Sequence, residues 1–185
     1  SSAISLGVTK IRLTGGEPLL DKNICNLIKK ISVLPGLKDL ALTTNGILLS
    51  SFAHKLASAG LNRVTVSLDS IDEDIFHKMS GRRGNVKKVL DGIKSAKDAG
   101  LGPIKINVVV QKFINDHAVL DLLEYFRGTG IIVRLIEFMD VGNRNGWKMN
   151  QVVPSYVLLK RIQKRWPLQP IDQNYIGEVA QRYKY

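Results

Sequence analysis

Basic side chains recur inside short segments rich in β-branched residues, where a buried strand would normally be apolar throughout. Lys10, Arg12, Lys105 and Arg134 each alternate with apolar neighbours. Since side chains alternate between the two faces of a strand, these four cations are predicted to share one face of a sheet whose other face is apolar. Unpaired buried cations are costly, so this face needs an anionic ligand or water. We expect it to bind phosphate or carboxylate groups; the alternative is an open sheet whose polar face is solvated.

The segment Gly15-Gly16-Glu17-Pro18 could bind a ligand at the carboxyl end of the first strand, where parallel α/β proteins keep their ligands. Glycine has no Cβ, so a ligand can approach the backbone closely. The carboxylate of Glu17 could accept charge-assisted hydrogen bonds from an ammonium group. The alternative is a strand-to-helix turn in which Glu17 caps the next helix.

A repeating strand and helix pattern must position these residues. Five β-branched segments are predicted to be strands: residues 9–14, 39–44, 63–69, 103–110 and 131–138. Amphipathic segments with helical periodicity are predicted to be helices: residues 22–33, 50–59, 85–99, 116–127 and 154–166. Residues 167–177 are expected to be a loop, and a strand-like run starts at Glu178. Strands joined through helices by short turns predict an α/β fold with a parallel sheet, either closed as a barrel or open.

The chain is basic, with 27 Lys and Arg against 16 Asp and Glu in 185 residues. Residues 141–185 hold 8 of the basic and 2 of the acidic residues, which favours an anionic partner. No run of apolar residues is long enough for a membrane span and no signal peptide is recognisable, so we expect a soluble intracellular protein without a membrane partner. Only 6% of the residues are aromatic, which disfavours stacking on nucleic-acid bases.

Five short strings give the chain a closer resemblance. They are KIRLTGGEPLL from Lys10, TTNG from Thr43, VSLDS from Val66, IKINVVV from Ile104 and RLIEFMD from Arg134. Together they closely resemble the radical S-adenosylmethionine (radical SAM) superfamily, and within it the GTP-cyclising family of molybdenum cofactor biosynthesis. The resemblance implies a partial (β/α)6 TIM-like barrel of parallel strands, incomplete at both ends. Residues 1–150 would be the central part of that barrel, and residues 151–185 the start of a C-terminal region.

The resemblance also implies a reaction and its cofactors. A 4Fe-4S cluster reduces S-adenosylmethionine to give a 5'-deoxyadenosyl radical, which abstracts the 3' hydrogen of the ribose of GTP. The sugar radical then attacks C8 of guanine, and the product is a cyclised pyranopterin precursor of molybdenum cofactor. Such cofactors carry the difficult chemistry, so the protein's part is to position and shield.

Residue by residue, the resemblance assigns two sets of contacts. The set for S-adenosylmethionine is Gly16, Ser67 and Met139, with Glu17 meeting the methionyl ammonium group. The set for GTP is Arg12, Thr43 and Lys105, with Lys10 and Arg134 as further phosphate contacts. No catalytic side chain and no metal ligand of this chain is implied. Arg82 and Arg83 could assist a phosphate or be solvated in a loop.

The chain departs from the family in its cysteines. The family's CxxxCxxC motif and its second, three-cysteine cluster site have no match here, since Cys25 is the one cysteine in the sequence. Cys25 falls on an apolar helix stripe, where a structural thiol is expected. We therefore expect the chain to be the middle of a longer protein with two clusters, and to be inactive alone.

Two other interpretations stay open. The chain could belong to another radical SAM enzyme with the same GGEP motif, for example one acting on a peptide, or it could be a non-enzymatic module that binds nucleotides or nucleic acid. The four cations on one face favour a phosphorylated substrate, with GTP first. A homodimer stays open, and the compartment would be the cytoplasm, or a mitochondrion or plastid in a eukaryote.

Overall fold

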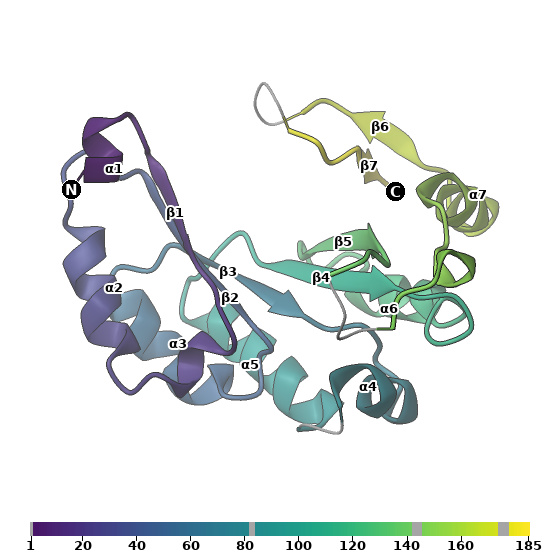
Figure 1. The fold of residues 1–185 in the computed structure, drawn as a ribbon, viewed down its shortest axis with the longest axis horizontal. Coiled ribbons are helices and arrows are strands. Elements are labelled where there is room, and N and C mark those ends of the chain that lie inside the picture. Colours follow the sequence, from purple (N-terminus) through teal and green to yellow (C-terminus); the bar gives the residue numbers. More distant parts are fainter. Residues whose placement is uncertain (1, 82–83, 142–145, 174–177) are drawn as a thin grey trace.

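The computed structural model describes residues 2–81, 84–141, 146–173 and 178–185. Its centre is a five-stranded parallel sheet whose strands lie side by side in chain order (Figure 1). They are β1 (Lys10–Leu13), β2 (Asp39–Thr44), β3 (Arg63–Ser67), β4 (Lys105–Val110) and β5 (Ile132–Glu137). Each connection between neighbouring strands contains a helix, as parallel pairing requires. The predicted α/β fold with a partial barrel is confirmed.

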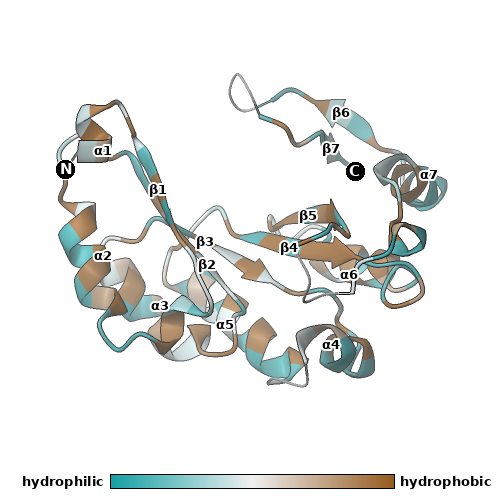
Figure 2. Ribbon diagram, in the orientation of Figure 1, coloured by the Kyte–Doolittle hydropathy of each residue, from teal (hydrophilic) through white to brown (hydrophobic). Residues whose placement is uncertain are grey.

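Helices cover one face of this sheet. They are α2 (Ile24–Ser32), α3 (Leu49–Ser58), α4 (Glu73–Ser80), α5 (Val86–Asp98) and α6 (Val119–Phe126), with the short α1 (Ser2–Ser5) before β1. Figure 2 shows the apolar stripes of α2, α3 and α5, which contribute fully buried side chains such as Leu56 and Val89. These pack with the apolar residues of the strands, for example Leu42, Val64 and Ile106. The core therefore lies between the helices and one face of the sheet.

The other face of the sheet carries the polar residues and is bounded by the C-terminal segment. Helix α7 (Ser155–Arg165) and the antiparallel pair β6 (Gln169–Ile171) and β7 (Arg182–Lys184) rise beside β5, on the side away from α2, α3 and α5 (Figure 1). The rings of Trp166 and Tyr185 stack with their centroids 5.4 Å apart. The Tyr185 hydroxyl donates to the carbonyl of Leu123 in α6 at 3.3 Å, so the pair is tied to the barrel wall.

Buried polar side chains hold the carboxyl ends of β3 and β4 together. Asn115 is fully buried, and its Nδ2 donates to the carbonyls of Asp69 (2.9 Å) and Val109 (2.8 Å). Its Oδ1 accepts from the amide of Gln111 at 2.8 Å. The Asp69 carboxylate accepts from the amide of Val109 at 2.8 Å. Side chains thus replace the backbone ladder where the two strands separate.

Several predicted boundaries were wrong, and the strand-like run predicted from Glu178 is a strand only from Arg182. The helix predicted over 116–127 begins only at Val119, because Asp116 accepts a hydrogen bond from the amide of Phe113 and closes a turn instead. The predicted third strand ends at Ser67 because the side chain of Asp69 takes over pairing with β4. The predicted loop 167–177 contains β6, whose three residues are too few to show a strand pattern. The division near residue 150 stays a prediction.

A substitution at Gly92 in α5 tests how tightly the helical layer is packed. A Cβ at this position in α5 would lie 2.7 Å from the carbonyl oxygen of Gly46 and 2.9 Å from the Cβ of Leu49. Overpacking costs about 1–3 kcal/mol and exceeds the gain in helix propensity of about 1 kcal/mol. Gly92→Ala is therefore expected to destabilise the full-length protein by about 1–2 kcal/mol in urea unfolding, whereas Lys94→Ala on the exposed side should be nearly neutral. Equal stability of Gly92→Ala and the parent would contradict this packing.

Candidate functional site

Strand register brings the predicted polar residues into neighbouring rows on the open face. Thr43 pairs with Thr65, and Thr65 with Lys105, so all three share one row. Ser67 and Arg134 belong to the next row toward the carboxyl ends, on either side of Asn107. Residues in register on parallel strands point to the same face. The structure therefore brings together predicted GTP contacts that lie up to 91 positions apart in the sequence.

Arg12 is held over the middle of this face by two hydroxyls. Its Nη1 donates to Thr43 Oγ1 and to Thr65 Oγ1, each at 3.1 Å. Thr65 is fully buried, so its hydroxyl is a fixed acceptor. These two hydroxyls, on neighbouring strands, orient the guanidinium.

A second arginine, Arg63, lies toward the amino ends of the strands and is already paired. Its Nε donates to Asp39 Oδ1 at 2.8 Å and its Nη2 to Asp39 Oδ2 at 2.5 Å. These hydrogen bonds lower the pKa of Asp39, partial burial opposes them, and the charges of Arg63, Lys10 and Arg12 add to the lowering. Lys10 itself is exposed and stands in register with Asp39, two residues before Arg12 on the same strand. The structure thus places Lys10 at the far end of the predicted set.

The pKa of Lys105 is lowered by its surroundings on this face. Burial lowers the pKa of its ammonium group, the positive charges of Arg134, Arg63 and Arg12 lower it further, and the carboxylate of Glu178 opposes them. Positive charges that lie close together repel one another and so raise the free energy of the site. An anion bound among them lowers that free energy. We call Arg12, Lys105 and Arg134 the cation cluster.

Arg63 and Glu178 were not among the predicted site residues. Arg63 could have been found, because the alternation of strand residues puts it on the same face as Thr65. Glu178 gave no such signal, because its position depends on how residues far along the chain pack beside β5. Arg82 and Arg83 lie outside the described residues.

Glu17 ties two glycine-containing turns together. Its Oε1 accepts from the amide of Leu19 (3.0 Å) and the hydroxyl of Thr44 (2.7 Å), and its Oε2 accepts from the amide of Asn45 (2.7 Å). The capping role considered as the alternative is confirmed, since Glu17 is the N-cap of the short helix Pro18–Leu20. A carboxylate has about four acceptor positions, so one remains for a ligand. The contact with an ammonium group stays a prediction.

The other residues predicted for S-adenosylmethionine lie at the carboxyl edge of the sheet. Gly16 follows β1, Ser67 ends β3 and is exposed, and Met139 follows β5 with 53% of its surface exposed. A Cβ added to Gly16 would meet no atom within 4 Å, so its backbone is open to a ligand. Gly15 has φ +152°, which residues with a side chain rarely adopt. The edge is accessible at three strands, as a cofactor site requires.

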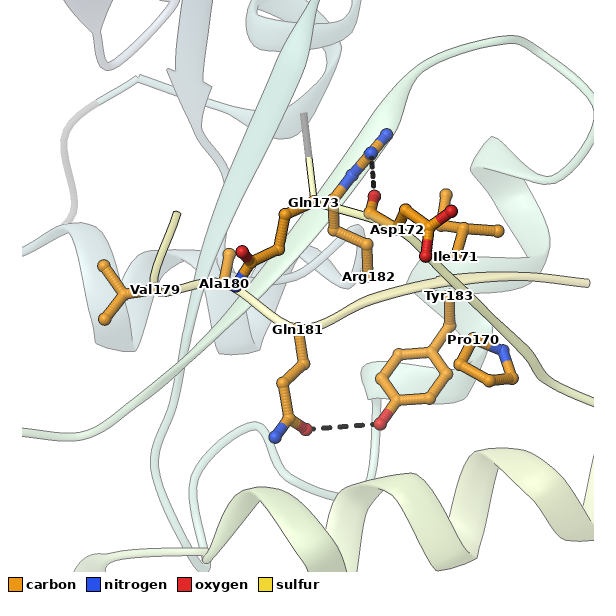
Figure 3. A pocket seen from close by; sticks show the side chains of 9 residues that line it. All are labelled: Pro170, Ile171, Asp172, Gln173, Val179, Ala180, Gln181, Arg182 and Tyr183. Carbon is orange, nitrogen blue, oxygen red and sulfur yellow. Dashed lines mark hydrogen bonds between the residues drawn. The ribbon is translucent and has the colours of Figure 1, made fainter. Parts of the chain in front are cut away.

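Two cavities lie near the C-terminal segment. One, of about 740 Å³, runs along β6 and β7 (Figure 3), where Arg182 donates to the carbonyl of Asp172 at 2.6 Å and Tyr183 to Gln181 at 3.2 Å. Arg182 already donates to a backbone carbonyl, and the carboxylate of Asp172 lines the same cavity, so this cavity offers little to an anion. The other, of about 610 Å³, lies between β5, α7 and these strands and is lined by Lys105 and Arg134. The second cavity is therefore the one that continues the cation cluster.

Neither a metal site nor a membrane-spanning helix is found in the part of the chain that the structure describes. No three His, Cys, Asp or Glu side chains among those residues could hold a metal ion together. Cys25 is half-buried in α2 and packs against the core, as predicted. No helix within the described ranges is long and apolar enough to cross a membrane.

Fold and site together define a class of protein, a parallel α/β half-barrel with basic residues on its open face and a glycine-rich turn after its first strand. A family model described as the radical SAM superfamily matches residues 2–126. The chain belongs to the radical SAM superfamily. The predicted resemblance is confirmed.

One relative and two solved structures show how far the similarity extends. The chain is 54% identical over 182 residues to a protein named GTP 3',8-cyclase from Xanthomonas campestris pv. campestris (strain B100); the match covers 98% of this chain and 54% of the relative. The chain thus spans about half the length of that relative. A radical SAM methyltransferase from Sphaerobacter thermophilus matches with a TM-score of 0.66 at 19% identity, over 88% of this chain and 50% of that one. Native anSMEcpe with bound AdoMet and Cp18Cys peptide matches with a TM-score of 0.61 at 20% identity, over 85% and 46%. The structures share the fold.

Glu17→Gln tests whether the carboxylate joins the two turns. The carboxylate of Glu17 now accepts from three donors, and the amide nitrogen of glutamine cannot accept from any of them. A donor left without an acceptor costs about 1–3 kcal/mol. We expect a loss of stability of that size in urea unfolding of the full-length protein. Asp98→Asn, on the exposed side of α5, is the matched control and should be near neutral. Retention of full stability by Glu17→Gln would show that the turns do not depend on this carboxylate.

The raised pKa of Asp69 predicts that the stability of the protein depends on pH. Burial raises its pKa to about 6, against 3.8 for an ordinary aspartate, although the hydrogen bond from Val109 lowers it. Between these two pH values the folded protein keeps a proton that the unfolded chain has lost, so the contribution of Asp69 to stability falls as pH rises. Asp69→Asn should remove that slope and be more stable than the parent by about 2 kcal/mol at pH 7. Unfolding free energies from pH 4 to 7 test this, and parallel curves for the two proteins would refute it.

Proposed function

We propose that the full-length protein containing this chain is a radical SAM GTP 3',8-cyclase, which converts GTP to the cyclised pyranopterin precursor of molybdenum cofactor. Membership of the superfamily supports the radical chemistry. The relative named GTP 3',8-cyclase supports the substrate. The observation that carries the proposal is the cation cluster. Burial and the neighbouring positive charges lower the pKa of Lys105, and a ligand with several negative charges would relieve this cost.

The proposed substrate is a nucleotide, and the positions of the cations suggest how it lies. Arg12, Lys105 and Arg134 would contact the phosphates, the arginines through their planar forks. The hydroxyl of Thr43 would be a further hydrogen-bonding group. Successive residues on one face of a strand are about 7 Å apart, so Ser67 lies about that far from Thr65 along β3. That spacing accommodates a ribose between phosphates on the cation cluster and a cofactor at the carboxyl edge.

The carboxyl edge fits S-adenosylmethionine. When bound there with a reduced 4Fe-4S cluster, it supplies the radical that abstracts the ribose 3' hydrogen. The open backbone of Gly16, the exposed hydroxyl of Ser67 and the side chain of Met139 would hold it, and the remaining acceptor position of Glu17 would take its ammonium group. The task of these residues is to hold cofactor and substrate close together while water is excluded.

This chain does not fit a 4Fe-4S cluster by itself. Such clusters are held by several cysteine thiolates, and the sequence has one cysteine, packed against the core in α2. We place the ligands of both clusters in the part of the relatives' length that this chain does not span. In this proposal the chain contributes the floor of the site, and other segments of the full-length protein contribute the iron ligands.

Nucleic acid is a poorer partner for this site. The side chains on the open face of the five strands, within the ranges that the structure describes, include no aromatic ring on which a base could stack. A homodimer and a cytoplasmic location are compatible with the proposal and are not required by it.

The test is GTP binding and turnover by the full-length protein, reconstituted without oxygen. Loss of one charged contact costs about 1.5–3 kcal/mol, so Arg12→Met and Lys105→Met should each raise the Kd for GTP roughly tenfold or more. The Kd for S-adenosylmethionine should stay the same. Lys94→Met, on the exposed side of α5, is the control. Unchanged GTP affinity in both variants, or turnover of a peptide in place of GTP, would contradict the proposal.

A further inference from the structure

Asn107 lies in the middle of the open face, and its side chain makes no hydrogen bond there. It belongs to β4, and the strand register places it between Ser67 of β3 and Arg134 of β5. The side chain is half-buried, and its Oδ1 is enclosed by the protein without a hydrogen-bond partner. No hydrogen bond from its Nδ2 is found in the described part of the chain. The carboxamide therefore adds no hydrogen bond to the described fold.

A polar side chain at this position is unfavourable for the sheet itself. Asparagine is depleted in strands, and the neighbouring positions of β4 hold the strand-forming residues Ile106 and Val108. A buried polar atom without a partner costs free energy, and most such atoms in native proteins have one. Asn115 shows the usual situation, because its carboxamide makes three hydrogen bonds. A ligand therefore explains Asn107 better than the fold does.

The backbone of Asn107 is fixed on both sides, so the carboxamide is positioned before any ligand binds. Strand β4 pairs with β3 and with β5, and the carbonyl of Asn107 accepts from the amide of Leu68 at 3.0 Å. Lys105 of the cation cluster is two residues earlier on the same face, about 7 Å toward the amino end of β4. The strand continues to Val110. Asn107 thus lies between the cation cluster and the carboxyl edge of the sheet.

We propose that Asn107 holds the ribose of the nucleotide substrate by donating a hydrogen bond from Nδ2 to its 2'-hydroxyl. In the proposed function the phosphates lie on the cation cluster and the cofactor at the carboxyl edge, so the sugar spans the row that contains Asn107. The 3' carbon has to face the cofactor, which leaves the 2'-hydroxyl on the adjacent carbon to meet the sheet. Asn107 would then make the site select ribonucleotides over 2'-deoxyribonucleotides. This inference deepens the proposed function and rests on it.

The test is calorimetric titration of the full-length protein, reconstituted without oxygen, with GTP and separately with 2'-deoxyGTP. The wild-type protein should bind GTP roughly fivefold more tightly, the effect of one hydrogen bond between neutral groups. Asn107→Leu is of similar size and cannot form that bond, so it should raise the Kd for GTP by this factor and leave the Kd for 2'-deoxyGTP unchanged. Asn107→Ala gives the same comparison with a smaller side chain. Asn23→Ala, at an exposed position before α2, is the control and should keep the wild-type preference.

The two nucleotides separate a ribose contact from other roles of Asn107. The variant and the missing hydroxyl remove the same hydrogen bond, so their effects should not add. A structural role or a contact with phosphate would weaken both nucleotides equally and overturn the proposal, and so would a wild-type protein that binds both equally. A higher Kd for S-adenosylmethionine, with both nucleotides unaffected, would place Asn107 against the cofactor and also overturn it. GTP still binds in each of these cases, so the proposed function stands; a wild-type protein that does not bind GTP would refute the proposed function and this inference together.

Discussion

The gathering of positive charge on one face of the sheet is the constraint on which the site depends. A parallel sheet is normally covered by apolar layers on both faces, and here only the helical face is. The open face carries five cationic side chains on four of its strands, at Lys10, Arg12, Arg63, Lys105 and Arg134. Burial and mutual repulsion weaken the protonation of Lys105. The fold therefore holds a charge imbalance that an anionic ligand can relieve, and such an imbalance is what a binding site for phosphates needs.

Most carboxylates near this face accept hydrogen bonds from backbone amides and hydroxyls and do not pair with the cations of the cluster. Glu17 accepts from two backbone amides and a hydroxyl, Asp69 accepts from Val109, and Glu137 accepts from the amide and hydroxyl of Ser155 at the start of α7. Each holds a loop at the carboxyl edge in place. Acidic groups thus build the frame, while basic groups face the ligand.

Much of this could be predicted from the sequence, because alternation along a strand is a local property. The cations Arg12, Lys105 and Arg134 were placed on one face by a two-residue period, and the register of the strands confirms that placement. The C-terminal segment could not be predicted in the same way, since β6 is three residues long and contains Pro170. Glu178 is buried and lines the cavity beside β5 and α7, and the strand-like pattern that begins at this residue gave no indication of a site.

The central claim is that the open face binds the phosphates of GTP, and a crystal structure of the full-length protein with GTP tests it most directly. We expect phosphate oxygens within hydrogen-bond distance of Arg12, Lys105 and Arg134, with the ribose toward the carboxyl ends of β1 and β3. Phosphates bound elsewhere, with these three side chains solvated, would contradict it.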